Sequence, residues 1–65
     1  MENEKVRVGN MVSSENFGVG EIISVSQDGF TVQFDREPKN VCPHYNMDYG
    51  LQTLKFFTPS GYRIF

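Results

Sequence analysis

The side chains best suited to catalysis or ligand binding in this 65-residue chain lie in residues 42–49, which have the sequence CPHYNMDY. A cysteine near a histidine suggests a thiolate nucleophile, but a catalytic pair needs adjacency in space, which two positions of sequence separation do not supply. No Ser or Cys is tied to His44 by a recognisable motif, and no paired carboxylates occupy an apolar setting. We therefore expect no catalytic residues and a protein that is not an enzyme.

Metal and cofactor sites are not expected either. The chain has one cysteine, Cys42, and one histidine, so it lacks CxxC and every Cys/His spacing typical of zinc. Its glycine motif, Gly18-Val19-Gly20, has no third glycine, following helix or lysine with which to hold a nucleotide. The sequence predicts no metal ligands and no cofactor.

The aromatic residues favour binding over catalysis. His44, Tyr45 and Tyr49 lie within six residues of one another, and such a cluster can stack on a base, a peptide proline or a methylated cation. The simpler interpretation is that both tyrosines complete a small core, with their hydroxyls reaching water, and that His44 is a surface residue. Phe17 allows the same pair of interpretations, as a ring in a binding groove or a cap on the core.

A charged loop with the sequence DREPKN follows Phe34. Its Arg36 and Lys39 could form a small positive contact for a phosphate or an acidic partner. The simpler interpretation is a solvated connection between two strands.

A β-hairpin within residues 17–34 is the element that the sequence specifies best. Asp28-Gly29 predicts a two-residue turn with positive φ at both positions. With that turn closed, one face of the ribbon carries the apolar side chains of both strands, which are Ile23, Val25, Phe30, Val32 and Phe34. A slip of one residue would set apolar side chains against polar ones, so this register should be strongly specified. Ile22 falls on the polar face.

Two glycines shape the start of this hairpin, in the motif Phe17-Gly18-Val19-Gly20. They let the backbone bend while Phe17 folds back over the core, which a Cβ at either glycine would obstruct. Upstream, residues 5–14 predict a first strand that a turn or bulge at Gly9 interrupts.

The second half of the chain has weaker patterns. Pro43 limits Val41-Cys42 to a short edge strand, and residues 47–57 fit either a short helix or a strand. Thr58-Pro59-Ser60-Gly61 predicts a turn that closes a C-terminal hairpin. In that hairpin Phe57 faces Arg63 and Phe56 faces Ile64. Phe57 and Phe65 then lie on the face opposite Phe56 and Ile64, where an apolar patch could serve self-association.

Length and charge limit the class of protein. A chain of 65 residues makes one domain, 1–65, of modest stability, because it buries only about 60% of its unfolded surface. We expect residues 1–4 to be disordered. The opening MENEKVRVGN is not a signal peptide, and no apolar stretch could span a membrane, so we expect a soluble cytoplasmic protein. A net charge of −2 lacks the basic footprint of a strong, non-specific nucleic-acid binder.

Residues 6–35 resemble a known family. Their pattern is similar to the SH3-like, Tudor-like small barrels found at the end of bacterial DNA-repair helicases and in RNA-polymerase-binding transcription factors. The matching positions are Gly9, Phe17, Gly18, Gly20, Ile22, Val25, Val32, Phe34 and Asp35. The resemblance implies a barrel of about five short strands that binds protein, chiefly RNA polymerase. The VRVGN opening and the LKFFTPSGYRIF tail are similar to short uncharacterised proteins of gut Bacteroidetes.

The leading hypothesis is a non-catalytic protein-interaction module. A groove lined by Phe17, Tyr45 and Tyr49 would take a peptide or the strand edge of a partner. His44, Arg36 and Lys39 complete the set of candidate partner-binding residues.

Two alternatives stay open. The chain could bind nucleic acid weakly, through its aromatic rings and the cations Arg36, Lys39, Lys55 and Arg63. It could also be a structural homodimer assembled through the C-terminal hairpin.

Overall fold

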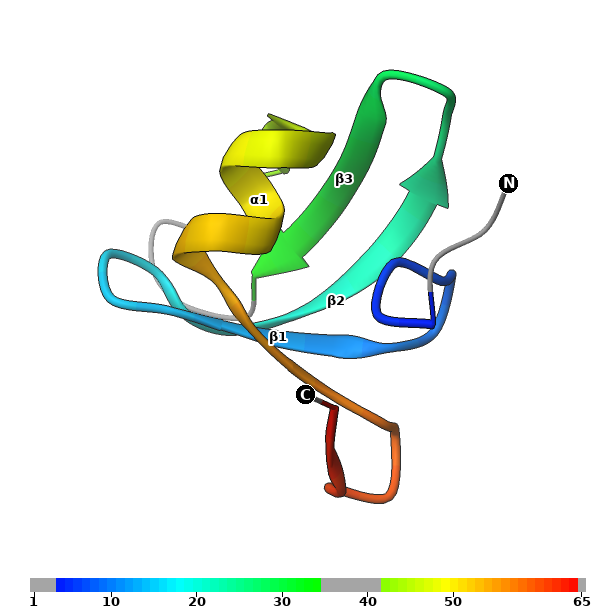
Figure 1. Cartoon of the computed structure of the whole chain (residues 1–65). Helices are drawn as coiled ribbons and strands as arrows, with labels where there is room; N and C mark the ends of the chain where they lie inside the picture. The colour runs from blue at the N-terminus through cyan, green and yellow to red at the C-terminus, as the bar shows by residue number, and fades with distance from the viewer. Residues whose placement is uncertain (1–3, 35–41, 65) are drawn as a thin grey trace.

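The computed structural model describes residues 4–34 and 42–64. Within these ranges six strands form one open antiparallel sheet, and a short helix follows the fourth strand (Figure 1). The elements are β1 (Met11–Ser14), β2 (Gly18–Val25), β3 (Gly29–Phe34), β4 (His44–Asn46), α1 (Met47–Thr53), β5 (Lys55–Phe57) and β6 (Arg63–Ile64). The order across the sheet is β4-β3-β2-β1-β5-β6. The prediction of a small, mainly β domain is confirmed, and of the two possibilities left open for residues 47–57 the structure shows a helix at Met47–Thr53.

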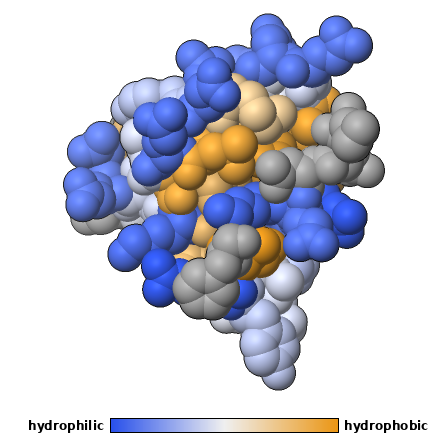
Figure 2. Space-filling view, in the orientation of Figure 1, coloured by the Kyte–Doolittle hydropathy of each residue, from blue (hydrophilic) through white to orange (hydrophobic). Residues whose placement is uncertain are grey.

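The core lies between the sheet and α1, which packs against β3 and β4. Its buried apolar side chains are Val6, Val12, Ile22, Phe30, Val32, Phe34, Tyr45, Leu54 and Phe56. Hydrophobic side chains also reach the surface on the face that carries α1, where hydrophilic groups surround them (Figure 2). No helix in the described ranges is long and apolar enough to cross a membrane.

The turn between β2 and β3 differs from the prediction by one residue. The backbone N–H of Ser26 donates to the carbonyl of Gly29 over 2.8 Å, which centres the turn on Gln27-Asp28 and not on Asp28-Gly29. Gly29 has no positive φ and begins β3. Its lack of a side chain matters for another reason, because a Cβ there would collide with the carbonyl oxygen of Tyr45 on β4.

A β-bulge in β2 corrects the predicted register. Ile22 pairs with Val32, whereas Ser24 pairs with Thr31, so the register shifts between Ile22 and Ser24. An inserted residue exchanges the two faces of a strand, and Ile22 is consequently buried while Ile23 is 41% exposed. The predicted faces of these two isoleucines were therefore wrong. The apolar face predicted for β3 is confirmed, since its side chains at positions 30, 32 and 34 are all buried.

The two glycines at the start of β2 behave as the sequence predicts. Gly18 has φ of 78°, which favours glycine. Gly20 is tightly packed, because a Cβ there would lie 2.6 Å from Cδ1 of Phe34. Phe17 is partly buried, and its ring packs on that of Phe34 with 5.1 Å between centroids.

The ambiguous segment 47–57 contains a helix and then a strand. Asn46 caps the helix, because its Oδ1 accepts a hydrogen bond of 2.8 Å from the N–H of Tyr49. The helix ends where the N–H of Leu54 donates to the carbonyl of Gly50. Upstream, the strand predicted over Val41-Cys42 is not found at Cys42, and Val41 lies outside the described residues. β4 begins at His44 instead, after the proline that cannot donate to a sheet.

The C-terminal hairpin has its predicted register. Phe56 pairs with Ile64 and Phe57 pairs with Arg63, and Gly61 closes the turn with φ of 96°. Phe56 is buried, whereas Phe57 lies on the opposite face and is partly buried. Phe65 lies outside the described residues.

The N-terminal segment forms a turn before β1. Gly9 has φ of 98°, as expected for an interruption there, but the residues before it are not a strand. The side-chain Nδ2 of Asn10 donates to the carbonyls of Glu4 and Lys5 at 3.0 and 3.1 Å, which fixes this loop and buries Val6. Of the four residues predicted to be disordered, Glu4 is described and accepts one of these hydrogen bonds, and residues 1–3 lie outside the described ranges.

Candidate binding groove

A ladder of aromatic rings leads from the core to the surface. Phe56 meets Phe30 with centroids 5.9 Å apart, and Phe30 stacks on Tyr45 at 5.7 Å. Tyr45 in turn stacks on Tyr49 at 6.1 Å, with only 11° between the ring planes. Exposure rises along the ladder, from 0% for Phe30 to 9% for Tyr45 and 55% for Tyr49. The outermost ring is therefore held from behind by the core.

Gly50 allows this ladder to form. It lies in α1, where a Cβ would collide with the ring of Phe30 and sit 3.3 Å from Cβ of Tyr45. The helix can approach the rings closely only because position 50 has no side chain. That approach places Tyr49, the preceding residue, on top of Tyr45.

A groove lies between the β1–β2 loop and α1. It has a volume of about 160 Å³ and is lined by Ser14, Glu15, Asn16, Tyr45, Tyr49, Thr53 and Leu54. The two outer rings of the ladder, Tyr45 and Tyr49, both belong to this lining. The groove thus combines one largely exposed ring with polar groups from two separate elements.

Ser14 organises the loop side of the groove. Its Oγ accepts hydrogen bonds from the N–H of Asn16 at 3.1 Å and of Phe17 at 3.4 Å. Such a hydroxyl-closed turn presents the intervening residue, Glu15, to solvent. On the helix side, Oγ1 of Thr53 donates to the carbonyl of Tyr49 over 2.7 Å.

The phenol of Tyr45 stays neutral at physiological pH. Burial raises its pKa above the ordinary value of 10.0, a hydrogen bond with Ser14 lowers it in part, and the neighbouring Tyr49 raises it again. A neutral phenol there can both donate and accept a hydrogen bond.

The described lining of the groove carries a negative charge. Among its described lining residues Glu15 is the one ionisable carboxylate, and none of them is basic. Asp48, beside Tyr49 in the first turn of α1, adds a second exposed carboxylate near this end of the helix. The arrangement disfavours an anionic ligand.

The structure separates the residues that the sequence placed together. His44 and Tyr45 are consecutive on β4, so they point to opposite faces. Tyr45 is buried, whereas His44 is exposed and forms a hydrogen bond of 3.1 Å with Oγ1 of Thr31. Phe17 does not line the groove, because its ring packs on Phe34.

Two predicted binding residues cannot be placed in the groove, and four of its polar lining residues were not predicted. Arg36 and Lys39 lie outside the described residues. Sequence reasoning missed the polar lining, Ser14, Glu15, Asn16 and Thr53. The serine followed by a short polar run was the available signal, because it is typical of a hydroxyl-closed turn.

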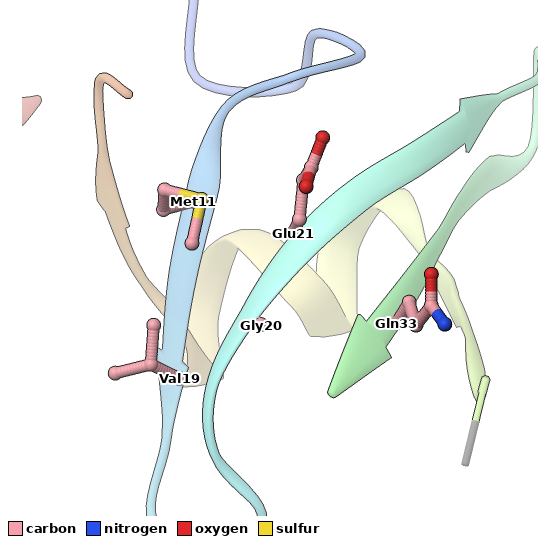
Figure 3. Close-up of a pocket in the computed structure, with 5 residues that line it drawn as sticks. All are labelled: Met11, Val19, Gly20, Glu21 and Gln33. Carbon is pink, nitrogen blue, oxygen red and sulfur yellow. The ribbon is translucent and has the colours of Figure 1, made fainter. Parts of the chain in front are cut away.

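Two of the other depressions on the molecule lie along the sheet. One is on the sheet face turned away from α1, where Met11, Glu21 and Gln33 project from three adjacent strands beside Val19 (Figure 3). The other lies where the N-terminal segment meets β5 and β6 and is lined in part by Lys5, Lys55 and Arg63. Among the described residues that line these two depressions, none is an exposed aromatic residue. No group of three or more potential metal ligands occurs among the residues that the structure describes.

Comparison of the chain with family models, curated proteins and solved structures finds no match in any of the three.

Proposed function

We propose that this chain is a non-catalytic protein-interaction module, and that it takes a segment of a partner protein in the groove between the β1–β2 loop and α1. The observation that carries the proposal is the exposed ring of Tyr49. Tyr49 as a residue is 55% exposed, although its ring stacks on that of Tyr45 and so has the core behind it. A rigid exposed aromatic side chain loses little conformational entropy on binding, and such residues dominate the energy of protein interfaces.

The strand pairing supports an SH3-like arrangement for this module. β1 pairs with β2 on one side and with β5 on the other, so a strand from the first half of the chain lies beside one from the second half. The short helix α1 lies between β4 and β5 in the chain, and its Met47 and Leu51 pack against the core. We propose that these strands form a small barrel of the SH3-like type.

The charge of the groove favours a protein partner over nucleic acid. Nucleic-acid binding rests mainly on cations that neutralise phosphates, and the described lining of the groove has none. Its hydroxyls, amide and carboxylate suit the mixed donors and acceptors of a peptide backbone and its side chains. The partner would therefore be an extended peptide segment or an exposed loop.

A comparison of two tyrosine variants tests the proposal. Tyr49→Ala removes the exposed ring of the groove, whereas Tyr62→Ala removes another exposed ring, 75% exposed, on the C-terminal hairpin. Affinity capture from the native lysate would identify partners of the wild-type chain, and binding of each purified partner would then be measured by calorimetry. We expect Tyr49→Ala to weaken binding at least about tenfold, as for an interface hot spot, and Tyr62→Ala to leave it unchanged.

The opposite pattern contradicts the proposal. If a purified partner binds both variants as it binds the wild type, the groove is not the interaction site. If instead single-stranded nucleic acid binds the chain at low salt with a steep salt dependence, the nucleic-acid alternative replaces the protein partner. Thermal unfolding of both variants is the control that they remain folded.

A further inference from the structure

We propose that the partner segment inserts an arginine side chain into this groove, with its guanidinium stacked on Tyr49 and paired with the carboxylate of Glu15. The inference rests on the proposed function, because it names the chemistry of the segment that the groove takes. Three properties of the groove support it: its size, the spacing of its rings and its charge.

The size of the groove suits one side chain. Its volume is about 160 Å³, whereas pockets that hold small molecules and cofactors measure about 300–1,000 Å³. A free ligand would leave most of its surface in water here. A side chain anchored by the rest of a bound peptide does not need such burial.

The spacing of the rings leaves one face open. Tyr45 and Tyr49 are nearly parallel with centroids 6.1 Å apart. A planar group between them would need about 7 Å, since carbon atoms pack at about 3.5 Å, so nothing can enter the stack. A ligand can stack only on the outer face of Tyr49. A base or a methylated cation enclosed by both rings is thereby excluded.

The charge of the groove selects a cation. The face of an aromatic ring carries negative electrostatic potential, and Glu15 adds a full negative charge to a lining without basic residues among those described. The hydroxyls of Tyr45 and Thr53 add acceptor oxygens. A cation gains from all of these groups, whereas an anion would be repelled.

Arginine fits the groove better than lysine. A guanidinium is planar, so it can lie flat on the open face of Tyr49 while its N–H groups point sideways to a carboxylate. An ammonium is a compact, strongly hydrated point charge that cannot satisfy both contacts with the same geometry. We therefore expect a preference for arginine over lysine.

Titration with blocked amino acids, followed by backbone amide chemical shifts in NMR, tests the inference. Acetyl-arginine amide should shift the amides of residues 14–16 and 46–54 with millimolar affinity. Acetyl-citrulline amide has nearly the same shape without the charge, and we expect it to bind about tenfold more weakly. Acetyl-lysine amide should lie between the two.

Variants assign the two contacts. Tyr49→Leu should abolish the shifts caused by acetyl-arginine amide, and Glu15→Gln should weaken its binding about threefold and remove most of its salt dependence. Tyr62→Leu and Glu21→Gln are matched controls, because both residues are exposed and lie away from the groove, and they should leave binding unchanged.

The outcomes separate this inference from the proposed function. Equal binding of the arginine and citrulline probes, or no effect of Glu15→Gln, overturns the arginine inference. Shifts of the same groove amides by acetyl-proline amide, with none from the arginine probe, overturn it as well but leave a protein-binding groove in place. If no probe shifts the groove amides, the arginine inference is wrong, and capture of a partner that depends on Tyr49 then decides the proposed function.

Discussion

Replacement of Gly50 by alanine should destabilise the protein, although alanine is the better helix former. Gly50 lies within α1 and has no positive φ, so helix propensity alone predicts that Gly50→Ala stabilises it by about 1 kcal/mol. A Cβ at this position would lie 2.6 Å from Cε1 of Phe30 and closer still to Cζ. The ring of Phe30 is fully buried and packed between Tyr45 and Phe56. The ring of Phe30 has no space to move aside, so the helix would have to shift away from it.

The two effects can be compared in magnitude. Added volume in a packed core costs about 1–3 kcal/mol. Both close atoms belong to one enclosed ring, so we take the upper part of this range. The gain in helix propensity from glycine to alanine, about 1 kcal/mol, is then subtracted from this cost. The expected net loss is about 1–2 kcal/mol in the free energy of unfolding. At about 4–8 °C per kcal/mol for a domain of this size, Tm should fall by roughly 4–16 °C.

Thermal and urea unfolding followed by circular dichroism measure this change. Gln52→Ala is the matched control, because it introduces alanine at an exposed position of the same helix, and it should stay within about 0.5 kcal/mol of the wild type. Phe30→Leu combined with Gly50→Ala should recover part of the loss, with a coupling energy above about 0.5 kcal/mol. A Gly50→Ala variant more stable than the wild type would refute the close packing of α1 on Phe30.

Three other outcomes follow from the bulge in β2 and from two perturbed pKa values. Ile22→Ala should cost about 2–5 kcal/mol and Ile23→Ala no more than about 0.5 kcal/mol in urea unfolding, whereas the reverse order would indicate a regular hairpin. Burial raises the pKa of Tyr45, so its neutral phenol contributes stability that is present below pH 10.0, the unfolded value, and is lost as the pH rises through the folded pKa. Tyr45→Phe should therefore flatten the fall of Tm between about pH 9 and 12, and an unchanged slope would count against burial of the hydroxyl. The Ser26 hydroxyl donates to Asp28 over 2.7 Å and lowers its pKa below 3.8, so this stability is present above pH 3.8 and lost as the pH falls through the folded pKa. Ser26→Ala should make Tm less sensitive to acid between about pH 2 and 5, which a wild-type profile would contradict.

Local sequence signals predicted the C-terminal turn, whereas they misplaced the turn between β2 and β3 by one residue. The C-terminal hairpin has its expected register because Pro59 and Gly61 each suit one position of the turn. The glycines at 18 and 20 were expected to be indispensable, and the structure gives a reason for each, a positive φ and a tight contact. In these cases the residue type itself carries the geometric requirement.

The candidate groove was predicted only in its aromatic half. Tyr45 and Tyr49 were expected to lie near each other, and their stacking across the junction of β4 and α1 brings them together. Glu15 lies 30 positions or more from both in the sequence. Its place in the groove follows from the pairing of β1 with its neighbours, which no local pattern reports.

The alternation of apolar residues and the positions of glycine and proline determined, by themselves, that this chain forms short strands with a small core. Only the tertiary structure decided which isoleucine of β2 enters that core, because one inserted residue exchanges the faces of a strand and the partner strand selects where it is inserted. It also decided that Gly29 meets another strand and that Gly50 meets a ring. Glycine in a sequence indicates freedom of the backbone or closeness of a neighbour, and the neighbour is known only once the chain has folded.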